Sequence, residues 1–188
     1  DLVEFKKLAS FERALPELTR VKIVAALSDV DEPDAGPPAK KAKQATPRPP
    51  KPSDAALAAF YEKVGSCEAE VREATQLKWA FMEFDDNDAT VIAYLIAEVM
   101  VALTKLFLGG NEIGPVGATA IAKALEVNVA LNTLYIYSNN IGDQGAIALG
   151  KALEVNVALN TLYISANQIG DQGAIALGKA LEVNVALN

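Results

Sequence analysis

The residue types that most often carry catalysis are scarce in this chain. It has no His, which removes the commonest general base and metal ligand. Its single Cys, Cys67, cannot form an internal disulfide or a Cys-rich zinc site. Cys67 lies on an apolar stripe, so we expect it to be a small core residue. No Gly-rich phosphate loop or nucleophile–base pair is present either, and we expect no enzymatic activity, catalytic residue or cofactor.

One acidic segment has the beginning of a calcium-binding loop. With Asp85 first, Asn87 third and Ile92 eighth, it resembles the start of a calmodulin-type EF-hand. The fifth position, a ligand in that loop, holds Ala89, and Ile96 stands where the bidentate Glu belongs. We therefore expect no metal site, and we interpret residues 85–88 as an acidic turn between two helices.

Three copies of one 28-residue pattern make up residues 105–188. Thr133–Asn160 and Thr161–Asn188 agree at 25 of 28 positions, and Lys105–Asn132 matches Thr133–Asn160 at 17. A fixed period of this size predicts a stacked array, in which each unit buries a face that it could not bury alone. Such an array favours a recognition scaffold over an enzyme.

Each unit is predicted to contain one strand and one helix. Leu134 and Ile136 alternate as in a short strand, so Tyr135 and Tyr137 point to its other face. After Asn139, Gly142-Asp143 predicts a turn and an N-cap. A helix with a face of small residues follows, formed by Ala146, Leu149, Ala152 and Leu153.

The core line of the unit, Leu131-x-x-Leu134-x-Ile136-x-x-Asn139-x-Ile141, resembles the leucine-rich repeat. Its 28-residue length and helical half resemble the ribonuclease-inhibitor-like subtype, which includes NLR receptors and GTPase-activating proteins for Ran. The resemblance implies an α/β fold: a right-handed leucine-rich-repeat solenoid with parallel concave strands and convex helices. It also implies a protein ligand held on the concave side.

The strand residues on the concave side are the candidate binding site. Exposed aromatic side chains in successive strands are typical of interface anchors, although an inter-strand aromatic ladder that only stabilises the sheet remains an alternative. The candidates are Lys105, Phe107, Tyr135, Tyr137, Tyr163 and Ser165. A separate column is expected to be structural, with buried amides that satisfy loop backbone groups: Asn111, Asn139 and Asn167.

Three further segments precede the array. Residues 1–28 are predicted to form a short helical segment, and the Pro- and Lys-rich residues 29–53 a disordered linker. Residues 54–104 are predicted to form a helical N-terminal cap, in which an apolar stripe runs from Leu57 to Phe84. The helix 90–103 ends in a copy of the pattern that closes each later repeat. We interpret it as part of a degenerate first repeat that covers the array.

These features predict a protein–protein interaction scaffold. A GTPase-activating or other GTPase-regulatory protein of the Ran type is the alternative, although no Arg follows Arg72. A nuclear adaptor that uses the basic linker, with Lys40, Lys41 and Lys43, is a weaker alternative.

Composition limits where the chain acts and what it binds. The net charge of −7 argues against nucleic-acid binding by the array, and the longest apolar run, residues 89–103, is shorter than the roughly 20 residues that a helix needs to span a bilayer. We expect a cytoplasmic protein, with import into the nucleus through the linker lysines as an alternative. We expect the array to be truncated, and we expect self-association through its uncapped C-terminal repeat.

Overall fold

The computed structural model describes residues 48–187, which belong to one compact unit, Ala45–Asn188. The predicted helical segment 1–28 and the linker lysines Lys40, Lys41 and Lys43 lie outside the described residues.

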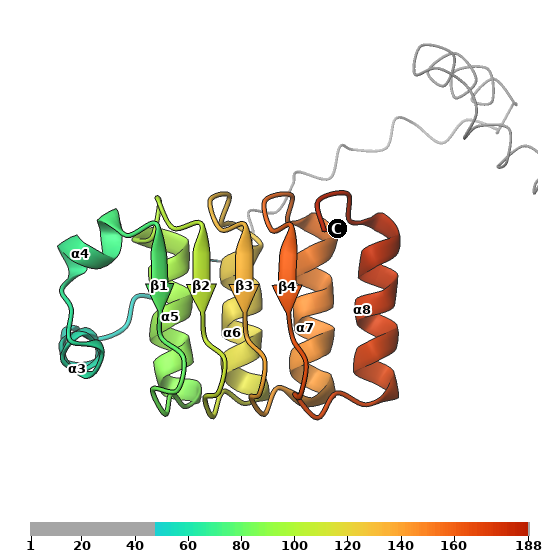
Figure 1. Ribbon diagram of the computed structural model, residues 1–188, viewed down its shortest axis with the longest axis horizontal. Coiled ribbons are helices and arrows are strands. Elements are labelled where there is room, and N and C mark those ends of the chain that lie inside the picture. Colours follow the sequence, from blue (N-terminus) through green and yellow to red (C-terminus); the bar gives the residue numbers. More distant parts are fainter. Residues whose placement is uncertain (1–47, 188) are drawn as a thin grey trace, which may run out of the picture. The chain divides into compact units, whose positions relative to one another are not determined.

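Four short parallel strands form one sheet in chain order (Figure 1). They are β1 (Gln76–Lys78), β2 (Lys105–Phe107), β3 (Thr133–Tyr135) and β4 (Thr161–Tyr163). The register aligns one Leu of each strand in a single row: Leu77, Leu106, Leu134 and Leu162. Each strand therefore occupies the same place in its own repeat.

One helix follows each strand, and all four lie on the same side of the sheet (Figure 1). They are α5 (Asp86–Glu98), α6 (Pro115–Leu125), α7 (Gly142–Val155) and α8 (Asp171–Val183). The alternation of strand and helix is the solenoid architecture that the repeat predicts.

The apolar core lies between the sheet and these helices. Leu106 and Leu134 are fully buried there, as are Leu125 and Leu149 on the helices. Burying a side chain of this size stabilises the fold by about 1.5–3 kcal/mol. Small residues allow the helices to approach closely: a Cβ added to Gly150 would lie 3.0 Å from the Ala176 carbonyl oxygen on the next helix.

The region before β2 contains helices, as predicted, and also the short strand β1. The stripe from Leu57 to Phe84 is not one helix or helix pair, because α3 (Asp54–Val64) ends at Gly65 with φ of 62° and α4 (Glu68–Glu73) ends well before Phe84. Leu77 lies in strand β1, and Phe84 lies in the loop that follows it. The first repeat thus has a strand of its own.

Two local predictions in this region are also wrong. Residues 85–88 are not a turn between two helices, because Asp86 already begins α5, which ends at Glu98. The Asp85 carboxylate accepts hydrogen bonds from the backbone of Asn87 and Asp88 and caps the N-terminus of this helix. Cys67 is not a core residue. It is exposed and stands at the N-cap of α4, whose buried residue is Val71.

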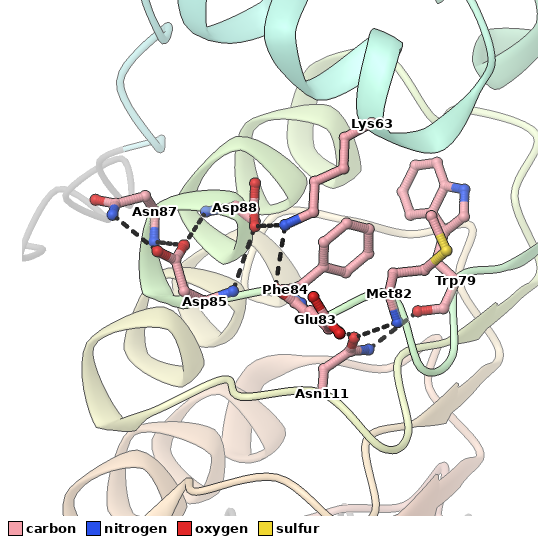
Figure 2. Close-up of polar contacts among 9 residues, drawn as sticks. All are labelled: Lys63, Trp79, Met82, Glu83, Phe84, Asp85, Asn87, Asp88 and Asn111. Atoms are coloured by element: carbon pink, nitrogen blue, oxygen red, sulfur yellow. Dashed lines mark hydrogen bonds and ion pairs between the residues drawn. The ribbon is translucent and has the colours of Figure 1, made fainter.

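Helix α3 covers the β1 end of the array. Phe60 of this helix packs against Trp79, with ring centroids 5.3 Å apart, and against Phe84, at 5.5 Å. Lys63 donates hydrogen bonds to the Glu83 carbonyl and to the Asp88 carboxylate, and its ammonium lies 5.2 Å from the Phe84 ring centroid (Figure 2). The apolar end of the first repeat is therefore closed.

Within the described residues, none of the helices has the length and apolar character needed to cross a membrane.

Candidate functional site

The face of the sheet opposite the helices, here called the strand face, carries the predicted binding residues. Alternation along each strand places residues 76 and 78 of β1, 105 and 107 of β2, 133 and 135 of β3, and 161 and 163 of β4 on this face. The same alternation continues to positions 109, 137 and 165, because parallel backbone hydrogen bonds extend past the strands, from Gly110 N–H to the Tyr137 carbonyl and from Ser138 N–H to the Ser165 carbonyl.

Three aromatic rings stand in one stack on the strand face. The Phe107 and Tyr135 ring centroids are 4.4 Å apart with planes 5° from parallel, and those of Tyr135 and Tyr163 are 4.4 Å apart with planes at 4°. Phe107 and Tyr135 are half-buried, whereas Tyr163 is 49% exposed. Both ring faces of Tyr135 are therefore covered by its neighbours, while Tyr163 keeps one face open.

Tyr137 lies outside this stack and packs across Gly109 of the neighbouring repeat. A Cβ added to Gly109 would lie 2.4 Å from the Tyr137 ring, so only Gly leaves room for the ring in its present position. The corresponding residue in the last repeat is Ser165, which is exposed. The column thus changes from Gly to Tyr to Ser along the array.

The strand face carries basic and neutral residues only. Lys105 is exposed, as is Lys78, which pairs in register with Phe107 and which sequence reasoning missed because β1 was taken as helix. Thr133, between the Lys105 and Thr161 positions, is largely covered.

The asparagines that follow the strands are buried and bridge neighbouring repeats. Asn111 accepts hydrogen bonds from the backbone of Met82 and Phe84 and donates to the carbonyls of Trp79 and Leu108 (Figure 2). Asn139 donates to the Leu108 and Ile136 carbonyls and accepts from Ile113 N–H, and Asn167 donates to the Ile136, Ile164 and Ser165 carbonyls. This geometry supplies partners to loop backbone groups that would otherwise be buried without them.

A second asparagine ladder runs along the opposite ends of the repeats and was not anticipated. Asn128, Asn156 and Asn184 each accept from two backbone N–H groups of their own loop and donate to a carbonyl of the preceding repeat. In the first repeat, Met82 stands in place of the asparagine of the first ladder, and Met100 stands in place of the asparagine of the second. An Asn there would have no preceding repeat to bridge, and an apolar side chain avoids a buried unpaired amide.

Comparison with known proteins identifies this repeat. Residues 102–122, 127–150 and 155–178 match the Leucine Rich repeat family. The array therefore has the fold of a leucine-rich-repeat solenoid. The predicted fold class is therefore confirmed, with a helical region before the repeats that also contains strand β1.

Two solved structures share this fold. Leiomodin-1 Actin-Binding Site 2 is 22% identical, with a TM-score of 0.60 and coverage of 72% of this chain and 77% of that chain. The tropomodulin C-terminal domain from Caenorhabditis elegans is 15% identical, with a TM-score of 0.54 and coverage of 72% and 80%. At such identities the shared property is the fold. No curated protein matches the chain significantly in sequence.

Aspartates link the helices of the solenoid. The Asp86 carboxylate accepts hydrogen bonds from Gly114 and Gly117 N–H at the start of α6, and Asp143 does the same for Gly170 and Gly173 at the start of α8. Asp143 was predicted to cap its own helix; instead it caps the helix of the next repeat.

Pro115 occupies the same position in the intervening repeat and has no carboxylate to offer α7. Helix α7 accordingly begins differently, at Gly142 with φ of 59°, and Gly142 N–H donates to the Asn167 carbonyl. In that neighbourhood the Asn167 Oδ1 atom has no hydrogen-bond partner, whereas Asn139 Oδ1 accepts from Ile113 N–H.

The acidic segment beside α3 has a structural role. Backbone N–H donation from Asp88 holds the pKa of Asp85 below its ordinary value, helped by hydrogen bonds from Asn87 and by the charge of Lys63 (Figure 2). Within residues 48–187, no cluster of three or more carboxylate or thiol ligands is placed to hold a metal ion.

Residues that are buried on α7, where α8 packs against it, have exposed counterparts on α8 itself. On α7, Ala146, Gly150 and Leu153 are buried. Their counterparts on α8 are exposed: Ala174, Gly178 and Leu181, the last at 56%. Between α8 and β4 lies an apolar groove of about 410 Å³, lined by Leu162, Ile164, Leu177, Leu181 and Leu187 among others.

Proposed function

We propose that this chain is a non-enzymatic protein-binding scaffold whose partner docks on the strand face of the solenoid, the side predicted to be concave. The single observation that supports this most is the row of aromatic side chains on that face, at positions where no core contact requires them. Rigid aromatic side chains supply contact area at low entropic cost, which is why they are enriched among interface anchors. The 28-residue period and the helical half of each repeat further support assignment to the ribonuclease-inhibitor-like subtype.

The binding test uses Tyr163 and Tyr137, the two tyrosines that do not have a stacked ring on both faces. Tyr163 has one ring neighbour and Tyr137 has none, whereas Tyr135 has two. Stacked pairs of this kind contribute about 0.5–1.5 kcal/mol each, so Tyr135→Ala is expected to lower stability along with binding. Tyr163→Ala breaks one stacked pair and should lower the melting temperature less than Tyr135→Ala does, whereas Tyr137→Ala breaks none and should leave it close to that of the unmodified chain.

The expected result is that each of these two substitutions weakens partner binding by about 1–2 kcal/mol, as loss of an interface anchor does. A pull-down first identifies a partner, with actin as one defined candidate because the similar leiomodin-1 domain is an actin-binding site. Titration of the variants follows, with Lys151→Ala and Lys179→Ala on α7 and α8 as controls. Normal binding by the tyrosine variants and loss in the helix variants would place the partner on the convex side instead.

Regulation of a GTPase remains the alternative function, and the positions of the arginines do not favour it. The two Arg residues in the described part of the chain are paired: Arg48 with Glu98 at 3.0 Å and Arg72 with Glu68 at 2.6 Å. Neither lies in a loop that follows a strand of the array. A nuclear adaptor function would depend on the linker lysines, whose contribution import assays on a Lys40, Lys41 and Lys43 variant would measure.

We also propose that the chain self-associates through the outer side of α8. The exposed Ala174, Gly178 and Leu181 repeat the surface that accepts a helix in the preceding repeat. The opposite end of the array is closed by Phe60 of α3, so a second copy would meet this surface with the same surface of its own. Such an isologous contact closes on itself as a dimer.

A further inference from the structure

We infer that the strand face takes an acidic partner: an extended segment rich in Asp and Glu. This inference deepens the proposed function and rests on it, because it specifies the chemistry of the partner on the same face.

The first argument is the distribution of charge. Residues 48–187 carry nine Lys and Arg against sixteen Asp and Glu, a net charge of −7. The strand-face positions nevertheless hold two lysines, Lys78 and Lys105, and no acidic residue. This face is therefore the basic surface of an otherwise acidic unit.

The second argument is that these two charges are uncompensated. The ion pairs formed within residues 48–187 involve Arg48, Lys51, Lys63 and Arg72. Five lysines of this part of the chain form none, and two of them lie on the strand face. Register pairs Lys78 with Phe107 and Gln76 with Lys105, so the two lysines stand diagonally on adjacent strands beside the aromatic stack.

The third argument is the orientation of the aromatic rings. Because Phe107, Tyr135 and Tyr163 stack face to face at 4.4 Å, they present their edges, not their faces, to a ligand. The ring edge carries the positive part of the aromatic quadrupole, and each tyrosine adds a hydroxyl donor at its far end. Tyr135 and Tyr137 are only half-buried, and Tyr163 is 49% exposed.

Together the face offers ammonium groups, hydroxyl donors and ring edges, which suit a ligand rich in acceptors. Carboxylates are the side chains that accept such bonds most strongly. Arg-rich or Pro-rich segments prefer open aromatic faces, and stacking covers four of the six ring faces, leaving one face each of Phe107 and Tyr163 outside the stack.

The test measures binding of labelled peptides by fluorescence anisotropy. Four strands about 4.8 Å apart are spanned by roughly five extended residues, so a peptide of about 12 residues is ample. The probes are peptides of alternating Glu and Ala, of Gln and Ala, and of Lys and Ala. We expect the Glu peptide to bind tightest, and its affinity to fall as salt shortens the range of the interaction, which is about 10 Å at 0.1 M.

Two double variants distinguish a local effect of the strand-face lysines from an effect of the net charge of the molecule. Lys78→Glu with Lys105→Glu should weaken the Glu peptide by about tenfold or more, whereas Lys151→Glu with Lys179→Glu changes the net charge equally on α7 and α8 and should have an effect of about twofold or less. Tyr135→Phe with Tyr163→Phe keeps the stack, in which Phe107 already stands, and removes two hydroxyls; weaker Glu-peptide binding is expected here as well.

Tighter binding of the Lys peptide, or equal losses in both lysine double variants, would overturn the acidic assignment. If no peptide binds but Tyr163→Ala still loses the pull-down partner, the strand face binds a partner of other chemistry and only this inference fails. If no peptide binds and the Tyr163→Ala variant also keeps its pull-down partner, both this inference and the proposed function fail.

Discussion

Leu134 and Leu162 hold the same position in two repeats that differ at three residues, yet their surroundings differ. Leu134 is fully buried between the sheet and the helices. Leu162 is half-buried and lines the open groove beside α8. A residue's contribution to stability depends on the neighbours that surround it, so near-identical sequence does not imply equal effects of substitution.

We therefore predict that Leu134→Ala lowers the free energy of unfolding by about 2–5 kcal/mol, through the buried methyl groups lost and the cavity left behind. Leu162→Ala should lower it by only about 1 kcal/mol, because part of its surface already meets solvent. Urea unfolding followed by circular dichroism measures both. Equal losses would mean that another molecule covers the groove beside β4.

At the scale of the helices, an aspartate of one repeat caps the N-terminus of the helix in the next repeat. Asp143 accepts two backbone hydrogen bonds at the start of α8, while Asp171, its counterpart in the next repeat, is exposed. The N-terminus of a helix has unpaired N–H groups, and a carboxylate placed there satisfies them and interacts favourably with the helix dipole.

This pair gives a second prediction with an internal control. Asp143→Ala should destabilise the chain by about 0.5–2 kcal/mol, the usual loss for a cap. Asp171→Ala removes the same charge without removing a cap of this kind and should change the unfolding midpoint little. Amide hydrogen exchange of Gly170 and Gly173 should accelerate in the first variant only. Similar destabilisation by both substitutions would attribute the effect to net charge.

The array could be predicted from sequence because its period is regular and its strand and helix patterns agree in every copy. Strand β1 was missed because its repeat is one residue longer and because Leu77 and Phe84 also fit helical spacing. The signal was present: Leu77, Trp79 and Phe84 stand 29 residues before Leu106, Leu108 and Ile113. Met82 and Met100 concealed it further, since the asparagines that mark later repeats are replaced where no preceding repeat exists to be bridged.

The candidate site was predictable by position but not by arrangement. Alternation from Leu134 and Ile136 placed Tyr135 and Tyr137 on the strand face. The parallel stacking of Tyr135 with both neighbours, and the lean of Tyr137 over Gly109, depend on ring orientations that a sequence pattern does not specify. Lys78 could enter the site only once β1 was recognised as a strand.

Within residues 48–187, the two ends of the array differ in what covers them. Phe60 of α3 closes the first repeat, whereas Ala174, Gly178 and Leu181 of α8 are exposed beside an apolar groove. Exposed apolar surface of this kind favours association, because burying it removes about 25 cal/mol per Å² of unfavourable contact with water. Association end to end in a continuing stack is blocked at the closed end.

We predict that the chain forms dimers, and that Leu181→Glu makes it a monomer by placing a charge in the apolar contact. Val155→Glu is the matched control, since Val155 at the end of α7 is 59% exposed and Leu181 is 56% exposed, but only Leu181 lines the groove. Sedimentation equilibrium measures the mass of each variant, and hydrogen exchange of residues 174–187 should slow as the concentration of the unmodified chain rises. An unmodified chain that stays monomeric, with uniform amide protection through α8, would show that this surface does not mediate self-association.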